Sequence, residues 1–276
     1  IAKPSAPITA PEFSNPLFIK TCCKALKARG ETVFPKGLQG INILFDFYVN
    51  SIEYNISLKK RYRPGETVVR DVLLQFASHL YPDHLFGIPL REARELINAF
   101  DPNPMVGAGL LDELIYEGVL AEDILPAKEN GKRGQPVVRF TYERFSDYFV
   151  AKKLIEKHVT DGYLQSAFEP GQPLGNLFSG THKYGLDGIL EAMAICIAEQ
   201  YHAELIDLVP KQDREDNWLF ELLFTQTLLR RSVASFTERT IELLNHIPEY
   251  GHRSTRLDIL LSLSTEARHP WNADFL

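Results

Sequence analysis

Residues Val137 to Leu154 read VVRFTYERFSDYFVAKKL, and within this stretch the sequence changes from strand-forming to helix-forming. Its first residues are β-branched or aromatic, which favours a strand, and the residues after Tyr142 follow the period of a packed helix. No glycine or proline separates the two halves. The stretch therefore predicts a strand that runs directly into a helix, with Tyr142 at the junction.

The residues before this stretch predict a helix followed by a β-hairpin. An amphipathic helix ends at Gly118, a common stop for helices, and two strand-like runs follow at residues 119–125 and 137–141. The residues between the two runs are rich in turn formers. Helices followed by a hairpin are the layout of a winged helix, and we assign residues 83–158 to such a domain.

Helical patterns also dominate toward the N-terminus. Pro16 suits the first position of a helix, where its missing N–H is no loss. Residues 38–56 are apolar on nearly every side, which predicts a central, buried helix. We assign residues 1–14 to an extended connector and residues 15–82 to a helical domain, so the winged helix is expected to follow a small helical bundle.

Only helical patterns remain after about residue 183. The first is a stripe of apolar residues at helical spacing, Leu186, Ile189, Leu190, Met193 and Ile197. Successive helices with short polar joints suggest paired helices of the HEAT or TPR type, although no self-similar period identifies a repeat. We assign residues 159–276 to a helical array. The predicted fold is mainly α: a helical bundle, a winged helix with a β-hairpin, and this array.

The composition is that of a folded protein and excludes several classes. Of the 276 residues, 45% are hydrophobic, and the net charge of −6 argues against a dedicated nucleic-acid binder. No apolar run has the length of a transmembrane helix, and no secretory signal is present. Cys22, Cys23 and Cys196 are expected to be reduced core thiols of a cytoplasmic protein. Because the chain starts at Ile1, we expect it to be part of a longer protein.

The sequence contains no recognisable catalytic or metal-binding motif. The run from Gly131 to Arg133 lacks the spacing of a phosphate-binding loop. The eight histidines never form a His-Glu-x-x-His pattern, and no serine lies in a nucleophile elbow. We therefore assign no catalytic residue and no metal ligand, and we expect that this chain alone catalyses nothing.

The tip of the predicted hairpin is basic and is the main argument for binding to nucleic acid. Lys132 and Arg133 could contact phosphates as the wing of a DNA-binding winged helix does. However, the helix that would enter a groove carries three acidic residues, Asp112, Glu113 and Glu117. Acidic groups repel phosphate, so nucleic acid is not the favoured partner.

Two segments resemble motifs of one protein family. Residues 140–151, FTYERFSDYFVA, resemble the winged-helix signature of NACHT-type STAND ATPases, Phe-x-His-x-x-Phe-x-Glu-Tyr-Phe-x-Ala. Residues 13–18, FSNPLF, resemble the proline segment that opens the helical lid of the same family, and residues 15–40 are most similar to its prokaryotic antiviral branch. The resemblance covers residues 1 to about 158, and the rest would correspond to the start of a helical sensor region.

The resemblance implies a cytoplasmic defence sensor that is switched by a nucleotide. ADP would keep the complete protein closed. Recognition of an invader protein and exchange for ATP, with Mg²⁺, would drive self-oligomerisation and activate an N-terminal effector. This chain would supply the lid, the winged helix and the first sensor helices, without the ATPase core, and no cofactor is expected for it alone. No membrane partner is implied.

The resemblance also implies two nucleotide-binding residues. Pro16 would lie against the adenine, and Tyr142 would take the place of the family's histidine, which contacts the β-phosphate of ADP. Tyr142 departs from the family pattern, because a phenol can donate one hydrogen bond but has no cationic form near pH 7. Asp147 replaces the usual glutamate, which is a smaller change.

Two other interpretations stay open. One is a winged-helix DNA-binding regulator with a helical ligand domain, which the basic hairpin tip would serve. The other is a helical protein-interaction scaffold, for which neither nucleotide nor DNA matters.

Overall fold

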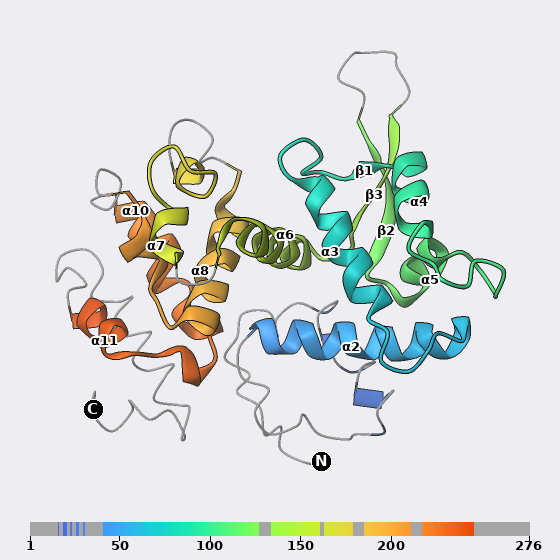
Figure 1. Ribbon diagram of the computed structural model, residues 1–276, viewed down its shortest axis with the longest axis horizontal. Helices are drawn as coiled ribbons and strands as arrows, with labels where there is room; N and C mark the ends of the chain where they lie inside the picture. Colours follow the sequence, from blue (N-terminus) through green and yellow to red (C-terminus); the bar gives the residue numbers. More distant parts are fainter. Residues whose placement is uncertain are drawn as a thin grey trace.

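The computed structural model describes residues 41–126, 134–160, 163–178, 185–210 and 217–245, with isolated positions between residues 16 and 30. This part of the chain is mainly helical with one small sheet, which confirms the predicted fold class (Figure 1). The α-helices are α2 (Ile41–Lys60), α3 (Val68–Leu80), α4 (Leu90–Asn98), α5 (Leu110–Glu117), α6 (Glu143–His158), α7 (Leu164–Ala167), α8 (Asp187–Tyr201), α9 (Leu205–Leu208), α10 (Asn217–Phe220) and α11 (Glu238–Asn245). The strands are β1 (Ile88–Pro89), β2 (Leu120–Leu125) and β3 (Gln135–Phe140). Short 3₁₀ and π turns complete the set: η2 (Gly175–Phe178), η5 (Glu221–Thr225), η6 (Leu228–Arg230) and η7 (Val233–Ser235).

The three strands form one small sheet with β3 at its centre. Its three strands lie in the order β1-β3-β2 and all pair antiparallel. In the hairpin Leu120 is paired with Phe140, and on the other side of β3 Ile88 is paired with Val138. The chain runs through α3, β1, α4, α5, β2 and β3 in that order. The predicted hairpin is therefore present, whereas β1 has only two residues and was not predicted.

The junction at Tyr142 lies where the sequence predicted it. β3 ends at Phe140, Tyr142 has an extended backbone (φ −121°, ψ 119°), and α6 begins at Glu143. In Figure 1, α6 lies between the sheet with its neighbouring helices and the group of helices around α8, and it packs against both α3 and α8. α6 therefore contacts both a helix that precedes it and a helix that follows it in the chain.

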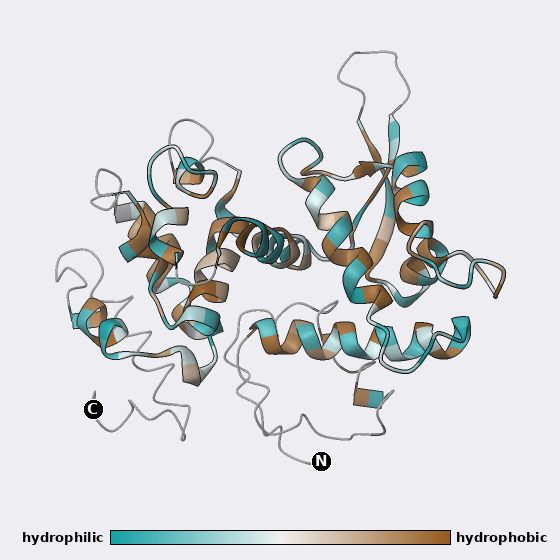
Figure 2. Ribbon diagram, viewed as in Figure 1, coloured by the Kyte–Doolittle hydropathy of each residue, from teal (hydrophilic) through white to brown (hydrophobic). Residues whose placement is uncertain are grey.

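One continuous apolar core joins these elements. It extends from α2 to α11 and includes the whole predicted stripe of α8. Figure 2 shows hydrophobic residues on the strands and on α8, and alternating hydrophilic and hydrophobic bands along α2. The buried helix predicted at residues 38–56 is confirmed as α2 for most of its length, although Tyr54 in its second half is exposed. The same half buries a charged residue, Lys60.

A buried ion pair anchors the loop between α4 and α5 to the end of α2. The Nζ atom of Lys60 lies 2.7 Å from Oδ2 of Asp101, and both side chains are shielded from solvent. The same ammonium donates to the carbonyl oxygens of Val106 and Ala108, at 2.6 and 2.8 Å. The hydroxyl of Tyr62 donates to the other oxygen of Asp101, at 2.9 Å. All three N–H donors of Lys60 are therefore used.

The predicted domain boundaries and the paired-helix repeat stay predictions. α3 precedes the boundary that we placed at residue 82, yet it packs against α2, α4 and α6 and so contacts both assigned domains. After α8 the described helices are short, with four residues in α9 and eight in α11. A predicted helix at residues 257–263 lies outside the described residues.

The cysteines match the expectation in part. Cys196 is buried, and burial raises its pKa to about 12, as expected for an inert core thiol. Cys23 is exposed, so the expectation of a core thiol is wrong at that position. Cys22 lies outside the described residues. In the part of the chain that the structure describes, no helix is both long and apolar enough to cross a membrane.

Candidate functional site

A pocket lies where α2, α6, α8 and η6 meet. It is a shallow, partly open hollow, and the roughly 270 Å³ of space within it includes open solvent. Its walls combine apolar and charged side chains: Ile41, Asn42, Phe45, Arg144, Tyr148, Glu191, Ala192, Ile195 and Arg230. Two of these residues come from the first turns of α6, so the stretch that decides the fold also contributes to the pocket.

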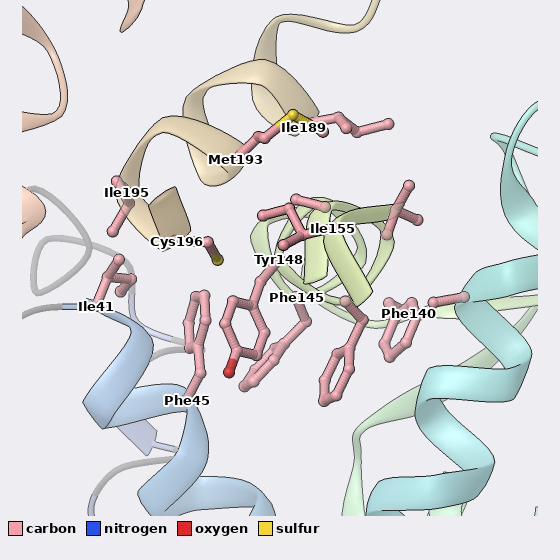
Figure 3. Packing of buried hydrophobic residues seen from close by; sticks show 14 of the residues in the cluster. Ile41, Phe45, Phe140, Phe145, Tyr148, Ile155, Ile189, Met193, Ile195 and Cys196 are labelled. Carbon is pink, nitrogen blue, oxygen red and sulfur yellow. The ribbon is translucent and has the colours of Figure 1, made fainter. Parts of the chain in front are cut away.

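The aromatic wall of the pocket is built around Phe45 of α2. Its ring centroid lies 4.4 Å from that of Phe145 and 5.5 Å from that of Tyr148, both on α6. Figure 3 shows Phe45 beside Tyr148, with the hydroxyl of Tyr148 directed toward α2 and Met193 of α8 above α6. Aromatic pairs at these distances stabilise beyond the area they bury, so α2 and α6 are packed together firmly.

Tyr142 stands at the edge of this wall. Its ring meets those of Phe45 and Phe145 edge-on, at 6.3 and 5.8 Å. It is half-buried and does not itself line the pocket. The structure therefore places the first candidate nucleotide contact next to the pocket, on the aromatic residues that form its wall.

A polar contact joins three helices behind the aromatic wall. The Tyr148 hydroxyl donates to Oδ1 of Asp46 on α2, at 3.2 Å, and Arg70 of α3 donates to the same oxygen, at 2.6 Å. Lys152 of α6 donates to the Tyr148 oxygen at 3.3 Å. Burial, and then the charge of Asp46, raise the pKa of Tyr148, so its hydroxyl stays protonated and available as a donor.

The charged side of the pocket is formed by two arginines that share one carboxylate. Glu191 of α8 accepts from Arg144 of α6 at 2.5 Å and is also paired with Arg230 of η6. The side chain of Glu191 is only 4% exposed, whereas that of Arg144 is 35% exposed. The carboxylate therefore lies at the back of the pocket and holds two elements in place.

Asp147 lies beside this group, where α6 approaches α8 closely. A Cβ atom added to Gly188 would overlap the carboxyl group of Asp147, so only a glycine fits there without a shift of Asp147. Burial raises the pKa of Asp147 to about 7; the positive charge of Arg144 lowers it, and the negative charge of Glu143 raises it. The close packing of the two helices thus costs Asp147 part of its hydration.

Replacing Asp147 with asparagine is expected to remove a pH-dependent penalty. The folded pKa of about 7 lies above the ordinary value of 3.8. The folded chain therefore binds this proton more tightly than the unfolded chain, and stability falls as pH rises between the two values. At pH 8 we expect the variant to be more stable than the wild type by on the order of 2 kcal/mol.

Urea unfolding at pH 4 and pH 8 measures this difference. The advantage of Asp147→Asn should be small at pH 4, where the carboxyl is largely protonated in the folded state. Asp123→Asn is the control, because hydrogen bonds lower the pKa of Asp123, and it should show no gain at pH 8. An advantage of Asp147→Asn that does not grow with pH would contradict the prediction.

Pro16, the second candidate nucleotide contact, is exposed at a helical position and does not line the pocket. The nucleotide-binding roles of both residues stay predictions. The described residues also contain no group of acidic, histidine or cysteine side chains that could hold a metal ion.

The arginine–glutamate group was not predicted from the sequence. One signal was present: Glu191 follows Leu190 within an otherwise apolar stripe and is buried. A charge at a core position of a helix needs a partner. The partner residues could not be identified, because Arg144 and Arg230 lie on other elements, far away in the sequence.

The acidic residues of α5 form ion pairs with lysine and arginine side chains of α2 and α4. Lys59 of α2 donates to Glu113 and Glu117 of α5, at 2.8 and 2.9 Å. Asp112 of α5 lies 3.3 Å from Arg94 of α4. α5 therefore presents acidic groups that are already paired within the chain. The basic hairpin tip lies outside the described residues.

No protein-family model matches this chain, and neither the curated proteins nor the solved structures contain a match to it.

Proposed function

We propose that this chain is the regulatory region of a nucleotide-switched STAND-type ATPase that acts in antiviral defence or signalling. It would comprise the lid, the winged helix and the first sensor helices. The observation that carries the proposal is the position of α6. Its first two turns contact α2 through the Phe45 cluster and α8 through Arg144 and Glu191.

Such an element suits a switch. A movement of the N-terminus of α6 would shift its contacts with both α2 and α8, because packed interfaces shift between discrete arrangements rather than deform gradually. The motif residues Phe145, Tyr148 and Phe149 are buried in the core. Tyr142 is half-buried at the helix start, where helix N-termini favour anionic groups. This difference supports a packing role for most of the motif and a ligand contact for Tyr142.

On this proposal the chain has no catalytic residue of its own. ADP or ATP with Mg²⁺ binds to the complete polypeptide, which also contains a phosphate-binding loop. A protein ligand and self-oligomerisation follow from the same proposal, as does a cytoplasmic location. The paired acidic groups on α5 count against the rival function, a DNA-binding regulator.

Replacing Tyr142 with phenylalanine in the intact polypeptide tests the proposed contact. The variant keeps the ring packing on Phe45 and removes one hydrogen-bond donor, so ADP release should become about 2- to 10-fold faster. The release of a fluorescent ADP analogue, chased with excess ADP, measures the rate. Tyr163→Phe is the matched control, because Tyr163 is 67% exposed on another part of the chain.

Equal release rates for Tyr142→Phe and Tyr163→Phe would remove Tyr142 from the nucleotide site. Binding of duplex DNA to the same preparation distinguishes the rival function, a DNA-binding regulator, from the nucleotide switch. Salt-dependent binding to DNA that is lost in a Lys132→Glu, Arg133→Glu variant would favour the DNA-binding regulator. Binding of neither nucleotide nor DNA would favour the protein-interaction scaffold.

A further inference from the structure

The two residues that follow η6 are each bound by a glutamate from α8 or from the turn after it. The guanidinium of Arg231 lies 2.8 Å from the carboxylate of Glu204, and both side chains are shielded from solvent. The backbone N–H of Ser232 donates to Oε1 of Glu199, near the end of α8, at 2.8 Å. The segment of Arg231 and Ser232 is therefore held by polar contacts as well as by packing.

The other oxygen of Glu199 is bound by α2. The side-chain amide of Asn42, in the first turn of α2, donates to Oε2 of Glu199 at 2.9 Å. Asn42 is only 8% exposed. Figure 3 shows the neighbouring Ile41 close to Ile195 of α8, and both line the same hollow. One carboxylate thus joins the start of α2 to the segment after η6, with one oxygen for each.

The two hydrogen bonds of Glu199 should strengthen each other. Burial raises the pKa of Glu199, whereas the hydrogen bonds from Ser232 and Asn42 and the positive charge of Arg231 lower it. Each donor therefore favours the charged carboxylate, which is the stronger acceptor for the other donor. The first donor also fixes the rotamer of the glutamate, so the second hydrogen bond forms without that cost in entropy.

Glu204 extends this connection to α11. Its carboxylate accepts from Arg231 at 2.8 Å and from the hydroxyl of Thr240, on α11, at 2.6 Å. Arg231 directly precedes Ser232, whose N–H is bound to Glu199. A continuous series of polar contacts therefore runs from α11 through the segment after η6 to the first turn of α2.

We propose that Glu199 is a coupling residue: its carboxylate links the first turn of α2 to the segment of Arg231 and Ser232, and release of either donor weakens the bond to the other. A displacement of the helices after α8 then loosens the start of α2, and the reverse also holds, because coupling between two sites is reciprocal. This inference rests on contacts within the chain and does not depend on the proposed nucleotide switch.

Hydrogen exchange of single amides in this chain, followed by NMR spectroscopy, tests the proposal. The Ser232 amide reports its own hydrogen bond to Glu199. The amide of Met193, in the buried middle of α8, reports opening of the whole core. Asn42→Ala should accelerate the exchange of Ser232 about tenfold relative to that of Met193, an ordinary size for coupling between two sites.

Asn55→Ala is the matched control. Asn55 also lies on α2 and donates its side-chain amide to a carboxylate, that of Glu117, at 3.4 Å. Because this bond does not involve Glu199, the exchange of Ser232 relative to Met193 should stay as in the wild type. An acceleration of Ser232 by Asn42→Ala that does not exceed that of Met193, or that Asn55→Ala reproduces, would overturn the proposal.

Ser232→Pro tests the reverse direction, because proline has no N–H to donate to Glu199. The extended backbone of Arg231 (ψ 154°) suits a residue before proline. The reporter is the amide of Asp46, which in an α-helix donates to the carbonyl of Asn42. Its exchange should become about tenfold faster relative to that of Met193, and an unchanged ratio would overturn the proposal.

Glu199→Gln serves if either variant does not fold. A glutamine side chain has one oxygen and turns an N–H₂ group toward the second donor, so it can accept from only one of Asn42 and Ser232. Because the two bonds support each other, the amides of Ser232 and Asp46 should both exchange faster relative to Met193. Acceleration of only one of these two amides, or of neither, would overturn the proposal.

Discussion

Replacing Lys60 with methionine is expected to destabilise the chain by about 3–5 kcal/mol, a large part of the stability of an ordinary domain. In the wild type the Lys60 ammonium lies 2.7 Å from the carboxylate of Asp101. The variant leaves this carboxylate buried without a cation. It also removes the donor to the carbonyl oxygens of Val106 and Ala108. Because those contacts hold the loop between α4 and α5, that loop should lose its protection from hydrogen exchange.

Urea unfolding measures this loss, and the neighbouring residue provides the control. Lys59 is 39% exposed in its ion pairs with Glu113 and Glu117, so Lys59→Met should cost less than about 1 kcal/mol. Adding Asp101→Asn to Lys60→Met should recover much of the loss, since the buried charge is then gone. If Lys60→Met costs no more than Lys59→Met, the ion pair does not anchor the loop as described.

Replacing Phe45 with alanine is expected to cost a similar amount, about 3–5 kcal/mol. The ring is 2% exposed and lies against Phe145, Tyr148 and Tyr142. Its removal opens a cavity at the contact of α2 with α6 and takes away the aromatic wall of the pocket. Hydrogen exchange should therefore become faster in α2 and in the first turns of α6 together.

Tyr54→Ala on the same helix is the matched control for this prediction. Tyr54 is 59% exposed, and a substitution at such a position usually changes stability by no more than about 0.5 kcal/mol. Thermal or urea unfolding of the two variants compares the two positions directly. A cost for Phe45→Ala close to that for Tyr54→Ala would mean that the aromatic cluster does not hold α2 on α6.

The elements that could be predicted from the sequence are those with a strong local pattern. The strand-to-helix change at Tyr142 was predictable because no breaker separates the two halves. The end of α5 was predictable because glycine adopts, without strain, the left-handed backbone that often ends a helix. Gly118 has this backbone (φ 83°). The two residues of β1 are too few to show alternation, so their pairing with β3 could not be predicted.

The candidate site was less predictable, because it depends on contacts between distant parts of the chain. Arg144 and Glu191 are 47 positions apart, and Tyr148 and Asp46 are 102 positions apart. The burial of Lys60 could not be predicted from the sequence either. A lysine beside Arg61 at the end of a helix suggests a solvated residue, and only the return of the loop between α4 and α5 covers it.

The nucleotide content of the intact polypeptide that contains this chain tests the central claim most directly. The protein is purified without added nucleotide and denatured, and the released nucleotides are separated by anion-exchange chromatography. The account predicts stoichiometric ADP in the wild type and a reduced amount in Tyr142→Phe. A wild-type polypeptide that releases no nucleotide, and that binds none when ADP and Mg²⁺ are added, would contradict it.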